Sequence, residues 1–173
     1  MKFSDSYIET FGKPRVIITF GIIYFTSQFA IGSILHEIGI KELLVLQTTL
    51  SLHTFKSIIQ NWTSEGLIGV YLSHFYFDMF HPIWYSIFLS SLLAFIIKKR
   101  EIKKFSSLLV VMPFIAGVLD CVENIMHIFF LSRPEYLIAP LVIVSGVSAI
   151  TKWAITCISV LLIILLPLLV KRR

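Results

Sequence analysis

The sequence predicts an all-α fold, an integral membrane four-helix bundle whose first loop forms amphipathic, interfacial helices. Of the 173 residues, 57% are hydrophobic and only 14% are charged, and the mean hydropathy is +0.88. Soluble domains have about 45–50% apolar and about 25% charged residues, so this composition excludes an ordinary soluble domain. Four apolar stretches are each long enough for a membrane span of about 20 residues. We therefore treat residues 1–173 as a single membrane domain.

The first span is expected over residues 16–35, after a polar segment that lacks the small-residue cleavage site of a secretory signal. The outer loop, residues 36–69, follows it. Apolar residues recur in this loop at roughly helical spacing among polar neighbours, which predicts one or two helices lying on the outer membrane face. These residues are Leu43, Leu46, Leu50, Phe55, Ile58, Ile59 and Trp62. The helices would form a cap over the bundle or, alternatively, a lid over a lipid entrance.

The second and third spans are expected over residues 70–97 and 105–131. Pro82 predicts a kink in the second span, because proline cannot bond the carbonyl four residues earlier, here that of Asp78. The fourth span is placed at 149–170, within an apolar stretch that begins at residue 137. That stretch exceeds what one perpendicular helix needs to cross a core of about 30 Å. It forms either one long tilted helix or a separate interfacial segment over 137–148 followed by the span.

The basic residues indicate how the chain is oriented. An even number of spans puts both termini on one side, together with the connector between the second and third spans. That side collects eleven of the 15 Lys and Arg: Lys2, Lys13, Arg15, Lys98, Lys99, Arg100, Lys103, Lys104, Lys171, Arg172 and Arg173. The positive-inside rule therefore predicts that both termini are cytoplasmic. The same placement argues against a nucleic-acid partner, since these charges flank spans.

Ionisable residues form one stripe on each of the two middle spans. Within a membrane such residues are costly and by default mark a functional site. His74, Asp78 and His81 share a face of the second span at i, i+4 and i+7, and Tyr85 continues it. The third span carries a matching stripe of Asp120, Glu123, Asn124 and His127. A rise of about 1.5 Å per residue puts the two stripes at equal depth in the outer half of the bilayer. We expect them to form one site.

The preferred interpretation is a membrane-embedded enzyme that acts on a lipidic substrate by metal-assisted hydrolysis or oxidation. His74, His81 and His127 would be the nitrogen ligands of zinc, and the donor set also suits a carboxylate-bridged pair of iron or manganese ions. Glu123 would act as the base on bound water, with Asp120 or Asp78 as a further ligand or partner. The expected substrate-binding residues are Tyr85, Asn124 and Trp84.

Two other interpretations stay open. Without a metal, a buried carboxyl beside imidazole groups can run acid–base chemistry, such as moving a double bond in a lipid. Alternatively, the protein is not an enzyme, and the polar groups fasten the two helices, relay ions or protons, or serve a partner subunit. Lys152 is expected to extend to the membrane interface, with a counter-ion role for Asp120 or Glu123 as the alternative. The expected partners are the bilayer and a lipidic small molecule; self-association is left open.

The layout of four spans, a long first loop, a short basic middle connector and a basic tail resembles that of the small sterol-isomerase and sigma-2-receptor group of membrane proteins. This resemblance covers topology alone. In the first span, where that group has a characteristic acidic residue, the most polar deep position here is Gln28. The resemblance implies proton-transfer chemistry on a sterol-like or isoprenoid lipid and identifies no catalytic position.

Overall fold

A computed structural model describes residues 3–170, and every regular element within them is helical. The described part of the chain begins with α1 (Phe3–Phe11), and a 3₁₀ helix, η1 (Pro134–Tyr136), precedes its last helix. The remaining helices in chain order are α2 (Pro14–Leu35), α3 (Ile40–Thr48), α4 (Leu52–Ser64), α5 (Ile68–Asp78), α6 (His81–Arg100), α7 (Ser106–Ser132) and α8 (Ala139–Leu169). The all-α class predicted from the sequence is confirmed.

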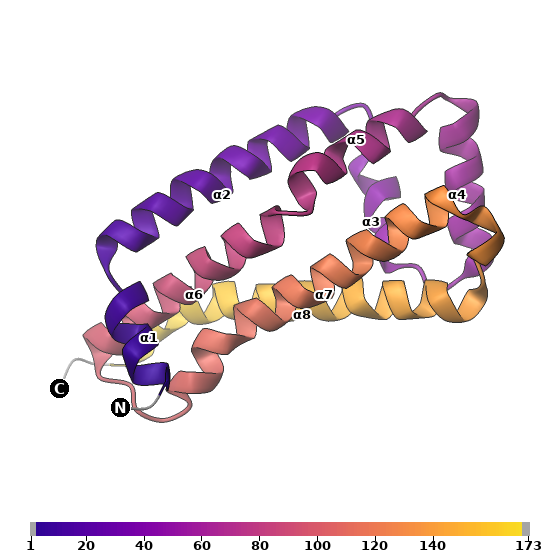
Figure 1. Ribbon diagram of the computed structural model, residues 1–173. Helices are drawn as coiled ribbons and strands as arrows, with labels where there is room; N and C mark the ends of the chain where they lie inside the picture. Colours follow the sequence, from indigo (N-terminus) through magenta and orange to yellow (C-terminus); the bar gives the residue numbers. More distant parts are fainter. Residues whose placement is uncertain (1–2, 171–173) are drawn as a thin grey trace.

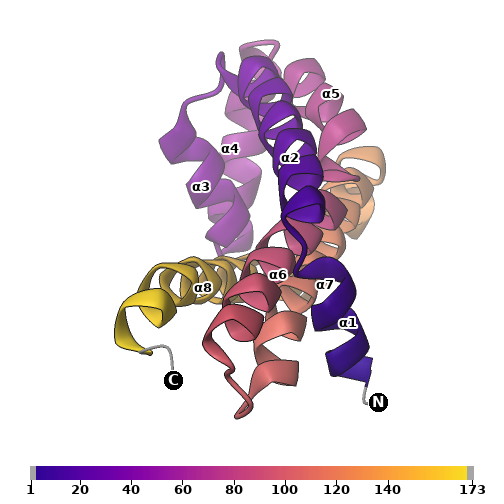
Figure 2. The same ribbon diagram turned by 90° about the vertical axis from the view of Figure 1, so that its left-hand side faces the viewer.

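Four of these helices, α2, α6, α7 and α8, are long and apolar enough to cross a membrane. They run along the length of the molecule (Figure 1), with α7 packed against both α6 and α8. Helix α2 packs on α5 and α6, whereas between α2 and α8 the described residues make no extensive contact. Viewed from the end, α2 and α8 lie on different sides of α6 (Figure 2).

The second predicted span is two helices. We expected one kinked helix over 70–97, but α5 ends at Asp78 and α6 begins at His81, with Met79 and Phe80 between them. Pro82 occupies the first turn of α6, where the missing N–H costs nothing, so the proline starts a helix instead of bending one. The break leaves the backbone carbonyl of Asp78 without its usual helical partner.

The long apolar stretch near the C-terminus is one continuous helix. Helix α8 has 31 residues, which is about 46 Å of helix and longer than a bilayer core of about 30 Å. Residues 137–148 are therefore mostly the first turns of α8, and a separate interfacial segment is absent from this part of the described chain.

Helices α3 and α4 occupy the predicted loop and cover the end of the molecule away from α1 (Figure 1). The turn between them rests on α8 at Gly146, where an added Cβ would lie 2.4 Å from the carbonyl oxygen of Thr49. The fully buried indole of Trp62 donates from Nε1 to Glu42 Oε2 at 2.9 Å, which ties α4 to α3. An apolar core that includes Leu46, Phe55 and Phe130 fills this end.

The opposite end holds α1, the α6–α7 connection and the last turns of α8 (Figure 1). Helix α1 packs on α6 and α7 through Ile8, which joins Ala94, Ile97 and Val110 in a second apolar core. Four of the basic residues that predict the orientation, Lys2, Lys171, Arg172 and Arg173, lie outside the described residues.

Candidate functional site

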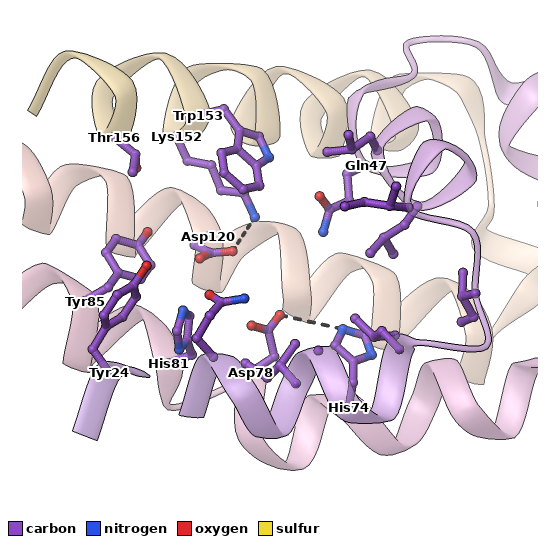
Figure 3. Close-up of a pocket in the computed structure, with 18 of the residues that line it drawn as sticks. Tyr24, Gln47, His74, Asp78, His81, Tyr85, Asp120, Lys152, Trp153 and Thr156 are labelled. Carbon is purple, nitrogen blue, oxygen red and sulfur yellow. Dashed lines mark hydrogen bonds and ion pairs between the residues drawn. The ribbon is translucent and has the colours of Figure 1, made fainter. Parts of the chain in front are cut away.

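The site is a cavity of about 610 Å³ enclosed by α2, α3, α5, α6, α7 and α8. Such a volume is in the range of pockets that hold small molecules. Eight of its lining residues are aliphatic, and polar groups converge in one part of it (Figure 3). The polar and aromatic side chains that line it are Tyr24, Gln28, His36, Gln47, His74, Asp78, His81, Tyr85, Asp120, Lys152, Trp153 and Thr156.

His74 and Asp78 face each other on the last turn and a half of α5. His74 Nε2 lies 3.7 Å from Asp78 Oδ2, and its Nδ1 is bonded to the backbone carbonyl of Tyr71. A carbonyl oxygen only accepts, so Nδ1 must carry a hydrogen. Nε2 of His74 and the carboxylate of Asp78 are then the two atoms of the pair that can take up a further proton. The pair therefore places two neighbouring proton-accepting atoms on the cavity wall.

Asn124 of α7 stabilises the break between α5 and α6 by a hydrogen bond. Its Nδ2 donates to the backbone carbonyl of Asp78 at 3.0 Å, the carbonyl that Pro82 cannot bond. Asn124 is buried and is absent from the cavity lining, so it positions Asp78 from behind. The sequence-based argument placed the two stripes at equal depth, and this contact between them agrees with it.

His81, the first residue of α6, presents a basic nitrogen to the cavity. The hydroxyl of Ser27 donates to the carbonyl of Tyr24 at 2.9 Å and is joined to His81 Nδ1 at 2.8 Å. Because a serine hydroxyl has one hydrogen, it must accept from Nδ1–H. The Nε2 of a neutral His81 is consequently a lone-pair acceptor. His81 lies in a row with Asp78 and His74 along one wall (Figure 3).

Lys152 of α8 is a buried counter-ion, which corrects the expectation that it extends to the interface. Its Nζ lies 2.5 Å from Asp120 Oδ1 and 2.7 Å from Glu123 Oε2. Asp120 and Lys152 face the row of histidines across the cavity (Figure 3). Helix α8 is apolar all round, so its sequence pattern does not reveal which face turns inward, and the signal for this pairing was weak.

Glu123 and His127 are sealed behind the cavity wall. Neither lines the cavity, and both are almost fully buried. His127 Nδ1 lies 2.6 Å from the hydroxyl of Tyr71, whereas its Nε2 and Oε1 of Glu123 have no hydrogen-bond partner among the described residues. The predicted site is thus divided: Asp78, His74, His81 and Asp120 face the cavity, and Glu123 and His127 do not.

Not all of the expected substrate-binding residues line the cavity. Tyr85 lines the cavity beside Tyr24. Trp84 points elsewhere and packs near Phe20 of α2, with ring centroids 6.3 Å apart. The lining contributed by α2, α3 and α8, including Gln47 and Trp153, was missed, because nothing in the sequence places these helices around the two stripes.

The three predicted zinc ligands do not surround one position. Each has its Nδ1 engaged with a different neighbour, and His127 lies outside the cavity. Within residues 3–170 there is no group of three or more His, Cys, Asp or Glu side chains arranged to hold a metal ion. The metal-assisted interpretation, with zinc or paired iron or manganese ions, stays a prediction.

Comparison with known proteins adds no further indication of function. No protein-family model, curated protein or solved structure matches the chain.

Proposed function

We propose that this protein is a multi-pass membrane enzyme that transfers protons to and from a lipidic molecule held in the cavity. The observation that carries the proposal is the row of His74, Asp78 and His81 on one cavity wall, which offers two neighbouring proton-accepting atoms at one end and the Nε2 acceptor of neutral His81 at the other. General acid–base catalysis requires such a pair within reach of one substrate. The chemistry suits moving a double bond or exchanging an acidic C–H.

The roles follow from the hydrogen bonds. His81 Nε2 accepts a proton from a carbon of the substrate, while Ser27 holds the ring in the required tautomer. The His74–Asp78 pair, in the form that has taken up one further proton, donates this proton to another carbon. Tyr85 and Tyr24 supply aromatic surface beside His81. One proton leaves the substrate and one returns, so the product is an isomer.

A lateral opening supports a lipidic substrate. The cavity walls contributed by α2 and α8 are not packed on each other, and the lining residues Gln28, Gly32 and Trp153 are exposed there. Both helices are apolar enough to cross a membrane, so this opening would face the hydrocarbon core. Aliphatic lining from α3, including Leu43 and Leu44, would contact the chain of the lipid.

The test measures deuterium on carbon. Purified protein in detergent is incubated in D₂O with a total lipid extract, and the lipids are analysed by mass spectrometry. A substrate whose product takes up deuterium on carbon supports the proposal. We expect Asp78→Asn to lower the incorporation by at least about 100-fold, the smaller effect typical of a lost general acid. Glu37→Gln is the matched control, because this exposed carboxylate is not part of the lining.

Other outcomes would contradict the proposal. Cleaved or oxidised lipids without deuterium on carbon would favour metal-assisted chemistry. Retention of all activity by Asp78→Asn and by His81→Gln, with lower thermal stability, would favour a polar network that only fastens the helices.

The proposed orientation has both termini in the cytoplasm, and α3 and α4 on the opposite side. It is supported by the basic residues at the α1 end, where Lys98 also pairs with Glu9 at 2.6 Å. A cysteine in place of Lys98 should react with an impermeant maleimide only in inverted vesicles, and one in place of Glu65 only in right-side-out vesicles. The reverse pattern would overturn the orientation.

A further inference from the structure

Glu123 and His127 have no part in the chemistry proposed above. Both side chains are almost fully buried behind the cavity wall. They lie one turn apart on α7, and each has a polar atom without a hydrogen-bond partner among the described residues, Oε1 of Glu123 and Nε2 of His127. An unsatisfied buried polar atom destabilises the folded state. No hydrogen bond or ion pair joins the two side chains in the described structure, so Oε1 of an ionised Glu123 would be a buried anionic oxygen without a donor; a proton on the carboxyl removes that charge.

The charges around Glu123 favour that protonated form. The titratable and charged groups that face it are Lys152 from α8, Asp120 and His127 from its own helix, and Tyr71 and Asp78 from α5. Lys152 is the lone cation in this set, and Asp120 already lies 2.5 Å from its Nζ. One ammonium balances one carboxylate. If Glu123 is neutral, the group of Lys152, Asp120 and Glu123 has no net charge; if Glu123 is ionised, the group holds a buried excess of negative charge.

Lys152 connects this sealed proton to the cavity, because its Nζ contacts both carboxyl groups. We propose that Glu123 stores a proton, which Lys152 carries to Asp120 on the cavity wall. In the transfer, Lys152 gives a proton to the Asp120 carboxylate and becomes an amine, and the Glu123 carboxyl then reprotonates that amine. The net change is one proton moved from Glu123 to Asp120. The inference rests on the proposed proton-transfer function, to which Glu123 would supply a stored proton.

The test is infrared spectroscopy of the whole protein in a maltoside detergent, which has no carbonyl group. A protonated carboxyl gives a C=O stretching band that an ionised one lacks. We expect this band in the wild type at neutral pH and a downshift of it in D₂O. Glu123→Gln should remove the Glu123 part of the band, and Asp120→Asn should leave that part in place. Glu123→Asp, which keeps a carboxyl on a shorter side chain, should move its frequency, while His53→Gln on the exposed face of α4 should not.

Absence of the band from the wild type at neutral pH would overturn the proposal, because Glu123 would then be a permanently ionised partner of Lys152. A band that is unchanged in Glu123→Gln would overturn it too, since the whole signal would then belong to other carboxyl groups. If Glu123→Gln fails to fold, the Glu123→Asp shift in the folded protein decides. These spectra need no substrate, so their failure is distinguishable from failure of the deuterium experiment, which tests the cavity chemistry.

Discussion

Lys152 is the residue on which the buried charges depend. Replacing it with methionine leaves Asp120 and Glu123 without a cation. Removing one partner of a buried ion pair costs about 3–5 kcal/mol, so we expect a clearly lower melting temperature in detergent. Lys41→Met, at an exposed position on α3, is the control. The double variant Lys152→Met with Asp120→Asn should recover part of the loss, and an unchanged melting temperature in Lys152→Met would contradict the ion pairs.

The histidines permit a separate prediction about metal. If protons alone carry the chemistry, turnover survives treatment with a chelator, and elemental analysis of the purified protein shows no stoichiometric zinc, iron or manganese. Near-stoichiometric metal that disappears in a variant with His74→Ala and His127→Ala would instead support the metal-assisted prediction. His53→Ala provides a control, because this histidine is exposed and distant in sequence from both stripes.

Residue spacing predicted part of the site. The i, i+4 spacing put His74 and Asp78 on one wall, since a helical period fixes which residues share a face. His81 lines the same cavity although it lies on α6, beyond the break that the pattern did not predict. Nor did the spacing predict that Glu123 and His127 are sealed off. Which neighbours of a stripe reach a cavity depends on how α7 is rotated between α6 and α8, and this is set by packing contacts far apart in the sequence.

At the scale of helices, the crossing of α6 and α7 depends on Gly117. An added Cβ would lie 2.3 Å from Ser86 Oγ and 3.0 Å from the carbonyl of Pro82. The Ser86 hydroxyl meanwhile donates to the carbonyl of Pro113 at 2.8 Å and cannot move freely. Small residues at such contacts let helix backbones approach closely in membranes.

Gly117→Ala should therefore destabilise the protein by about 1–3 kcal/mol, the usual cost of overpacking. The matched change is Gly69→Ala on α5, where an added Cβ meets nothing within 4 Å. It should leave the melting temperature unchanged or raise it, because alanine is the better helix former. Equal effects of both changes would argue against the close α6–α7 contact.

The sequence pattern predicted most of the helices but not where the second predicted span is divided. The four long helices follow from apolar length, and the helical loop from periodic spacing. The division of residues 70–97 into α5 and α6 did not follow, because the same proline is compatible with a kink or with a helix start. The choice between them depends on Asn124 of α7, whose side chain satisfies the carbonyl of Asp78.

For the molecule as a whole, the lateral opening between α2 and α8 can be closed by one residue. Gly32 lines the cavity, and a Cβ added there meets nothing within 4 Å. Gly32→Trp should fill the opening without disturbing the fold and should lower deuterium incorporation at least about tenfold, by the loss of bound substrate. Gly69→Trp, equally open but outside the lining, should retain activity. If both variants are fully active at unchanged melting temperature, substrate enters elsewhere.

The break between α5 and α6 also bears on how the protein is assembled. Helix α5 has 11 residues, about 16 Å of helix and roughly half of a bilayer core. It is too short to be inserted as an independent span and must enter joined to α6. The carbonyl exposed by the break gains its partner only when Asn124 arrives on α7, a segment that is synthesised later. If the chain enters a membrane helix by helix, the wall that carries His74, Asp78 and His81 would therefore be completed only when α7 docks against it.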